Sequence, residues 1–277
     1  MLALVPGGLL HAEPGDRVAA PAPATAPAAQ RSSGDPIVDQ LLDRLEARGR
    51  SIQGLSTRLE YRDVRTDPVP EEILRRGELL FRRLEPNPKF LIVFHETIAG
   101  GVVRNDPESF VFDGQWFVER HDRSKQIIRR QVVRPGERID PFRVGQGPFP
   151  LPFGQTRADM LANFVITRKP QITEEIADSD RLDCVPRPES DLARKYRAVS
   201  MWIDRKLDLP VRIQAERIAD DTILDVTFSK LNPHDAPAES RFRIDRPPGP
   251  DWEVREEPLP DRPAEPPGRI PARESRP

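Results

Sequence analysis

Apolar residues spaced three and four positions apart mark the first predicted element. They form one face of a helix and are Ile37, Val38, Leu41, Leu42 and Leu45. Asp35 can cap this helix, Pro36 suits its first position, and Gly49 is expected to end it. The pattern therefore predicts an amphipathic helix of about four turns.

From Leu55 onward, apolar and polar residues alternate, which is typical of strands. The alternation predicts roughly nine to eleven strands in hairpins, with SRFRID (240–245) as the closing strand. The segment PNPKFLIVFHETI (86–98) is apolar on both faces and should be covered on both. Around Asp113-Gly114 we expect a turn between strands at 108–112 and 115–121, with a third strand at 126–133.

A long loop at residues 134–155 is rich in proline and glycine and carries Phe142, Phe149, Leu151 and Phe153. Loops of this length are usually functional or disordered, and the apolar side chains predict one that folds over a hydrophobic surface. TRADMLANF (156–164) follows as a short helix with Thr156 as its N-cap. Strands and helices do not alternate, so the predicted class is α+β with an antiparallel sheet.

Many of the 32 prolines lie in two segments without apolar periodicity, 19–30 and 256–277. We expect both to be disordered. The predicted organisation is a signal-like segment with an Ala/Pro-rich leader at 1–34, one domain at 35–254, and a disordered tail at 255–277. Leu-His-Ala after an apolar start predicts export with cleavage after Ala12. The missing positive charges at the start indicate that translation begins further upstream.

Charge and motifs exclude several classes of function. The 43 basic and 45 acidic residues are interleaved, which disfavours nucleic-acid binding. No nucleophile, phosphate-loop, dinucleotide or metal motif is present, so neither an enzyme nor a cofactor is expected. The lone Cys184 cannot form an intramolecular disulfide and is interpreted as a small strand residue. His121-Asp122 is interpreted as part of a solvated turn. No stretch has 18 apolar residues, so no membrane span is expected.

The apolar residues exceed what one sheet face packed on one helix requires. Two interpretations remain open, and pattern alone favours the first: an ordinary packed core, or a concave sheet whose cover encloses a cavity. Trp116 and Phe117 must point to opposite faces of their strand, so at most one can face that cavity. We expect it to be Trp116.

The order of the elements resembles that of LolA, the periplasmic lipoprotein carrier family. GELLFRRLEPNPKF resembles the family's G-x-L-x-x-x-R-P…F segment, and SFVFDGQWFVERHDRSKQI resembles its DG…W-x-Y…Q hairpin. RADMLANF falls at the family's short internal helix, and MWIDRKLDLPVRIQAERIADDTILDVTFSKL resembles its paired late strands. SRFRIDRPPGPDWEV is similar to its closing F-x-F-x-x-P-x-G-x-x-V. The resemblance spans residues 36–254 and is specific mainly for the fold.

The resemblance implies an incomplete β-barrel whose concave face is covered by helices and holds the acyl chains of a lipoprotein. It implies a soluble, monomeric periplasmic carrier or chaperone with handover partners at the inner and outer membranes. Periplasmic sensors that regulate an anti-sigma factor share the fold. A non-transporting envelope sensor or interaction domain is therefore the alternative function.

The resemblance also implies candidate site residues. In the family, an arginine on an inner strand hydrogen-bonds to the lid and holds it closed; by position this is Arg83, although two extra residues precede Pro86 here. The candidate ligand-binding residues are Leu79, Phe81, Arg83, Phe90, Ile92, Phe94, Trp116, Met160 and Leu161.

Overall fold

The computed structural model describes residues 32–65, 69–138, 154–169, 176, 178–245 and 249–260. Its helices are α1 (Pro36–Ser51), α2 (Arg157–Asn163), and the 3-10 helices η2 (Asp191–Arg194) and η3 (Glu239–Arg241). Its strands are β1 (Gly54–Arg65), β2 (Glu71–Arg82), β3 (Lys89–Ala99), β4 (Val102–Arg104), β5 (Glu108–Phe112), β6 (Trp116–His121), β7 (Gln126–Gln131), β8 (Phe164–Lys169), β9 (Ser179–Pro186), β10 (Tyr196–Asp204), β11 (Leu209–Arg217), β12 (Thr222–Asn232) and β13 (Glu253–Glu257).

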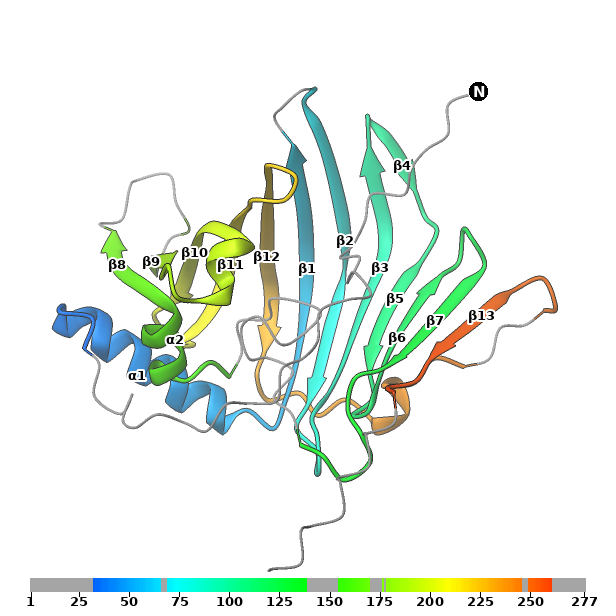
Figure 1. Ribbon diagram of the computed structural model, residues 1–277, viewed down its shortest axis with the longest axis horizontal. Helices are drawn as coiled ribbons and strands as arrows, with labels where there is room; N and C mark the ends of the chain where they lie inside the picture. The colour runs from blue at the N-terminus through cyan, green and yellow to red at the C-terminus, as the bar shows by residue number, and fades with distance from the viewer. Residues whose placement is uncertain are drawn as a thin grey trace, which may run out of the picture.

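These strands form one open, strongly curved sheet with both α-helices on its concave side (Figure 1). Their order is β13-β7-β6-β5-β3-β2-β1-β12-β11-β10-β9-β8, and β4 pairs with β3 outside this path. The predicted α+β class and the incomplete, helix-covered barrel are confirmed. Within the described residues the sheet has 13 strands, more than the predicted number. Neither α-helix there is long and apolar enough to cross a bilayer.

Helix α1 begins where the sequence predicts. Asp35 is its N-cap, and the Asp35 carboxylate accepts a hydrogen bond from the backbone N–H of Ile37 at 2.8 Å. The helix does not end at Gly49, however. A Cβ at Gly49 would lie 3.0 Å from the backbone of Gly154, so this glycine permits a close approach of two chain segments. The predicted helix end is therefore wrong by two residues.

The predicted turn between β5 and β6 is confirmed. The Asp113 carboxylate accepts hydrogen bonds from the backbone N–H groups of Gln115 (3.0 Å) and Trp116 (2.8 Å). Gly114 has a φ of 103°, which favours glycine. Helix α2 is also present as predicted, with the Thr156 hydroxyl accepting from the N–H of Asp159 at 3.0 Å.

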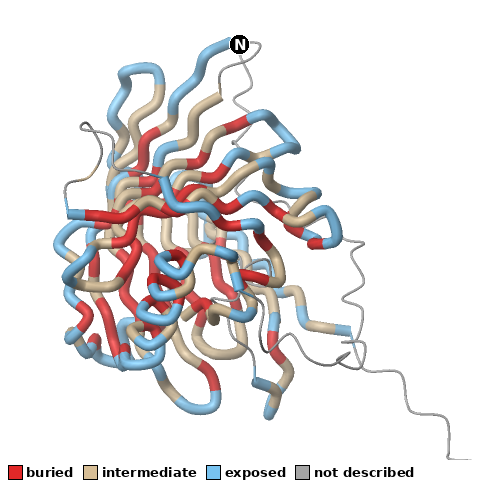
Figure 2. Tube along the Cα trace, turned by 90° about the vertical axis from the view of Figure 1, so that its left-hand side faces the viewer, coloured by how far each residue is buried: buried red, intermediate tan, exposed pale blue. Residues whose placement is uncertain are grey.

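The strands carry apolar residues on both faces, as β3 was predicted to do. A large cluster on the concave face includes Phe90, Ile92 and Phe94 together with the apolar side of α1. A smaller cluster on the convex face contains Leu80, Leu91, Val111 and Phe242. Figure 2 shows the buried residues running along the strands and the exposed residues gathered at the turns.

The segment SRFRID (240–245) is not a strand, which corrects the sequence prediction. Its first two residues belong to η3 and the rest is irregular chain, from which Phe242 and Ile244 pack into the convex cluster. Two apolar residues in alternation suffice to anchor an extended segment, so the pattern alone did not distinguish an anchor from a strand.

The chain remains ordered beyond residue 254, because β13 extends to Glu257. It lies parallel to β7, whereas every other described strand pair is antiparallel. The predicted start of the disordered tail at 255 is therefore wrong. Composition misled because β13 is held by backbone pairing and ion pairs with β7 and not by buried apolar residues. The predicted signal, the loop residues Phe142, Phe149, Leu151 and Phe153, and the chain after 260 lie outside the described residues.

Candidate ligand-binding site

Aromatic rings from three neighbouring strands form a continuous part of the concave face. Register places Phe90 opposite Phe112, and Phe112 opposite Phe117. The ring centroids of Phe90 and Phe112 are 5.8 Å apart, and those of Phe94 and Phe110 are 6.0 Å apart. All five rings are buried. We call these residues, Phe90, Phe94, Phe110, Phe112 and Phe117, the aromatic floor.

Most of the candidate residues lie together in the concave cluster. Each of the following is at most 3% exposed: Leu79, Phe81, Phe90, Ile92, Phe94, Met160 and Leu161. Core packing fully explains their burial, and a ligand-binding role for them stays a prediction.

Trp116 does not face the concave side, and the expectation that it would is wrong. Phe117 lies in the concave cluster instead. Trp116 shares its face with Val118, which pairs with the convex-side Val111, and the Arg129 guanidinium lies 5.2 Å from its ring centroid. Alternation established that only one of the two rings could face inward, but it could not identify which one.

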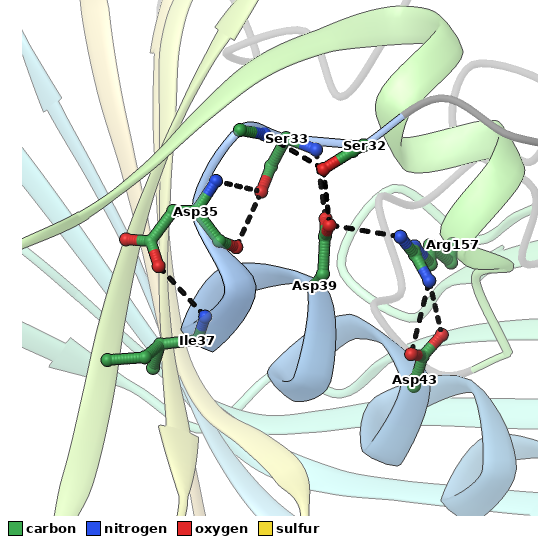
Figure 3. A network of polar contacts seen from close by, with 8 residues as sticks. Ser32, Ser33, Asp35, Ile37, Asp39, Asp43 and Arg157 are labelled. Atoms are coloured by element: carbon green, nitrogen blue, oxygen red, sulfur yellow. Dashed lines mark hydrogen bonds and ion pairs between the residues drawn. The ribbon is translucent and has the colours of Figure 1, made fainter.

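The two helices form a cover over the β8–β12 half of the concave face (Figure 1). Arg157 of α2 joins them, because its guanidinium lies 3.1 Å from both Asp39 and Asp43 of α1 (Figure 3). Its backbone N–H also donates to Glu46 at 2.7 Å. A hydrogen bond from Ser32 is the main reason that the pKa of Asp39 lies below its usual range.

Arg83 connects β2 to the end of α1. It follows the last residue of β2, and its Nε donates to the carbonyl of Ile52 and its Nη2 to that of Gly49, both at 3.0 Å. The last carbonyls of a helix lack partners within the helix, which explains why a guanidinium stabilises this end. The hydrogen bond to the cover that the family resemblance implied is present. Its role in opening and closing stays a prediction.

A charged group borders the aromatic floor, and the sequence prediction missed it. Arg75 Nε lies 3.6 Å from Glu108 Oε2, and His121 lies 3.7 Å from Glu108 and 3.6 Å from Glu119. Arg130 donates a hydrogen bond to Glu119. Arg75 and Glu119 are each 8% exposed, while Glu108 and His121 are half-buried. We call these residues, Arg75, Glu108, Glu119, His121 and Arg130, the rim cluster.

Mutual pairing changes the ionisation of the rim cluster. Contacts with Glu108 and Glu119 raise the pKa of His121 to about 9, so the imidazole is protonated at neutral pH. Burial alone would raise the pKa of Glu108, but His121 and Arg75 bring it below its usual range.

The turn predicted at His121-Asp122 is confirmed for Asp122, which begins the turn between β6 and β7 and pairs with Arg120. It is wrong for His121, which is the last residue of β6 and packs edge-on against Phe110 with ring centroids 5.8 Å apart. The sequence did carry a signal that these charged residues adjoin the aromatic floor. Phe117, Glu119 and His121 are spaced two apart, and residues at this spacing share a strand face.

Other features of the molecule are weaker candidates for a functional site. A surface groove of about 500 Å³ is lined by Gln131, Arg134, Pro135, Gly136, Glu137, Leu259 and Pro260, none of them a candidate residue. Within the described ranges no three His, Cys, Asp or Glu side chains are grouped to hold a metal ion. Cys184 is buried as expected, and burial raises the pKa of its thiol, which disfavours a reactive thiolate.

No protein-family model matches the chain, and no curated protein sequence does. Among solved structures, the chain is similar to an uncharacterized conserved protein from Thermus thermophilus, with 10% identity over 80% of this chain and 99% of that one and a TM-score of 0.47. A Pseudomonas aeruginosa MucA/MucB complex shares 14% identity over 76% of this chain and 61% of that one, with a TM-score of 0.42.

A LolA superfamily protein from Nitrosomonas europaea shares 14% identity over 74% of this chain and 96% of that one, with a TM-score of 0.34. These likenesses are distant, and the site described above stands on the residues of this chain alone. A LolA superfamily protein is thus among the solved structures that this chain resembles.

Proposed function

We propose that this chain binds the acyl chains of a lipoprotein, or of a related lipid, against the concave face of its sheet. In this proposal it is a soluble periplasmic carrier or chaperone that shields the chains between an inner-membrane donor and an outer-membrane acceptor. The observation that carries the proposal is the aromatic floor, a broad apolar surface. Beside it lies the helical cover, which polar contacts hold at its edge.

The chemistry of the cover supports an exchange of cover for ligand. Helix α1 contributes Val38, Leu41, Leu42 and Leu45 to the concave cluster, and these contacts are aliphatic and non-directional. An acyl chain makes the same kind of contact and gains about 0.8 kcal/mol per buried methylene. Arg83 and Arg157, whose polar contacts hold the cover, can exchange their protein partners for water. When the cover opens, the acyl chain replaces its apolar contacts and water replaces its hydrogen bonds. Opening therefore costs little free energy.

The alternative is a non-transporting envelope sensor or protein-interaction domain of the same fold. The observation that favours it is the dense packing of the seven candidate residues in the concave cluster, each at most 3% exposed and in one cluster with α1. In that case the concave face serves only as a core.

Co-purified material distinguishes the two functions. The full chain is isolated from the cell envelope under mild conditions and analysed by mass spectrometry. A stoichiometric lipid or lipoprotein supports the carrier. A lipid-free preparation that takes up no fluorescent fatty acid, such as cis-parinaric acid, but retains one protein partner contradicts the carrier and supports the sensor.

A further inference from the structure

Two atoms of the rim cluster are buried without a hydrogen-bond partner. They are Nε of Arg75 and Oε2 of Glu108, which lie 3.6 Å apart. Arg75 as a whole is only 8% exposed. A buried donor or acceptor without a partner loses its hydration and gains nothing in return. The two atoms therefore offer one donor and one acceptor to an incoming polar group.

The rim cluster is paired by charge more than by hydrogen bonds. The contacts of Glu108 with Arg75 and His121, and of His121 with Glu119, are all 3.6–3.7 Å, longer than a normal hydrogen bond. Polar groups at such separations are commonly bridged by a third group. The Glu108 and His121 side chains are 27% and 23% exposed, so a ligand can reach them from solvent.

The buried and half-buried charges of this region balance. Arg75, protonated His121 and Arg130 face Glu108, Glu119 and also Glu257 of β13, which lies 2.8 Å from Arg130. Arg255 also pairs with Glu257 at 2.8 Å, but its side chain is 68% exposed and its charge is solvated. A ligand group with a net charge would leave one charge in this half-buried site uncompensated, which is costly. A zwitterionic group adds an opposite pair and leaves the balance intact.

The rim cluster also adjoins the aromatic floor directly. The Arg75 guanidinium lies 5.9 Å from the centroid of the Tyr61 ring, and Tyr61 packs on Phe94 at 5.7 Å. His121 packs on Phe110. A polar group held at the rim cluster therefore places any attached acyl chain on the apolar surface.

We propose that the rim cluster binds the head group of a zwitterionic amphiphile of the phosphoethanolamine type. The phosphate accepts hydrogen bonds from Arg75, the ammonium donates to Glu108, and the acyl chain lies along the aromatic floor. This inference rests on the proposed acyl-binding function and specifies the head group that accompanies the acyl chain.

Three single-chain probes with the same acyl chain test this. They are lysophosphatidylethanolamine, anionic lysophosphatidylglycerol and neutral monoacylglycerol, each titrated below its micellar concentration by calorimetry. We expect the zwitterionic probe to bind about tenfold more tightly than the other two. Arg75→Met, Glu108→Gln and the charge-neutral double variant should each remove this preference. Arg76→Met, on the opposite face of β2 and paired with Glu60 and Glu96, is the matched control and should retain it.

Each outcome separates the head-group inference from the acyl-binding proposal. Equal affinity for all three probes, or tightest binding of the anionic probe, overturns the head-group site while acyl binding stands. Failure of all three probes overturns the proposed function itself. The double variant guards against misfolding, since it removes both members of the ion pair, and denaturant unfolding must show a cooperative transition before its affinity is interpreted. A variant that folds and still prefers the zwitterionic probe also overturns the inference.

Discussion

Trp116 and Phe117 are neighbours on β6, yet the structure gives them different surroundings. Phe117 is 6% exposed and packs on Phe90 and Phe110, whereas Trp116 is half-buried beneath Arg129. A strand presents successive side chains to opposite faces, so a shift of one residue would have exchanged the two. Phe117, rather than Trp116, is the ring of this pair that an acyl chain would meet.

We therefore expect Phe117→Ala to lower the free energy of unfolding by about 3–5 kcal/mol, as truncation of a buried aromatic ring does. Trp116→Ala removes a partly exposed ring and one cation–π contact and should cost about 1 kcal/mol. Urea denaturation of both variants measures the difference. Equal losses would contradict the assignment of the two faces.

His121 shows how a half-buried residue can depend on partners that lie apart in the sequence. Its pKa is raised to about 9 by Glu108 of β5 and Glu119 of β6. In the unfolded chain an imidazole titrates near its usual 6.5. The folded state thus binds the proton more tightly, so the His121 contribution to stability is fully present below about pH 6.5 and is lost as the pH rises through about 9.

Replacement of His121 by Gln should therefore destabilise the protein at pH 6 and have much less effect at pH 9.5 or above. Chemical denaturation at both pH values measures this, and the exposed His95→Gln serves as a control. An equal loss of stability at both pH values would show that His121 contributes through packing and not through its charge.

At the scale of elements, the position of α1 depends on the contacts that its ends make. The Arg83 guanidinium, although the residue is largely exposed, bonds to two carbonyls at the C-terminal end of the helix. Its neighbour Arg82 instead donates to the carbonyl of Pro237, away from the helix. The two arginines form a natural pair for testing how the cover is held.

Arg83→Met should lower the free energy of unfolding by only about 1 kcal/mol, because its bonds are partly solvated. It should accelerate hydrogen exchange at the end of α1 and increase the rate of fatty-acid uptake. Arg82→Met is the matched control and should leave both rates unchanged. If Arg83→Met alters neither rate, Arg83 does not hold the cover.

Strand β13 illustrates an element held mainly by charge. The Gln126 amide donates to Glu253 at 3.0 Å, Arg129 pairs with Glu256 and Arg130 with Glu257, and the strand is largely exposed. Exposed ion pairs are individually weak and are screened by salt.

Raising the ionic strength from about 0.05 M to about 1 M should therefore accelerate amide exchange in β13 without affecting β2 and β3. Glu256→Gln combined with Glu257→Gln should have the same effect at low salt. Exchange that is insensitive to salt and to the substitutions would mean that the backbone ladder with β7 suffices.

At the scale of the whole molecule, local signals predicted the fold well. Asp35 and Thr156 cap their helices as expected, and Asp113-Gly114 forms the expected turn, because each depends on a few adjacent residues. Features that depend on distant partners were missed. The role of Gly49 depends on the close approach of Gly154, and the formation of β13 depends on its pairing with β7.

The site followed the same rule. The alternation of β2 and β3 predicted the shared concave face of Leu79, Phe81, Phe90, Ile92 and Phe94. The rim cluster required the register of β2, β5, β6 and β7, because its charges come from four strands. Sequence could also not separate a core from a cavity, since both use the same apolar side chains.

The central claim is that an acyl chain binds the aromatic floor of the concave face and that the adjoining helical cover moves aside to admit it. Hydrogen exchange of the full chain with and without saturating cis-parinaric acid tests it most directly. The account predicts stoichiometric binding, faster exchange in α1, and unchanged or slower exchange in β3, β5 and β6. Absence of binding, or binding that changes exchange only at the convex segment 239–245, would contradict it.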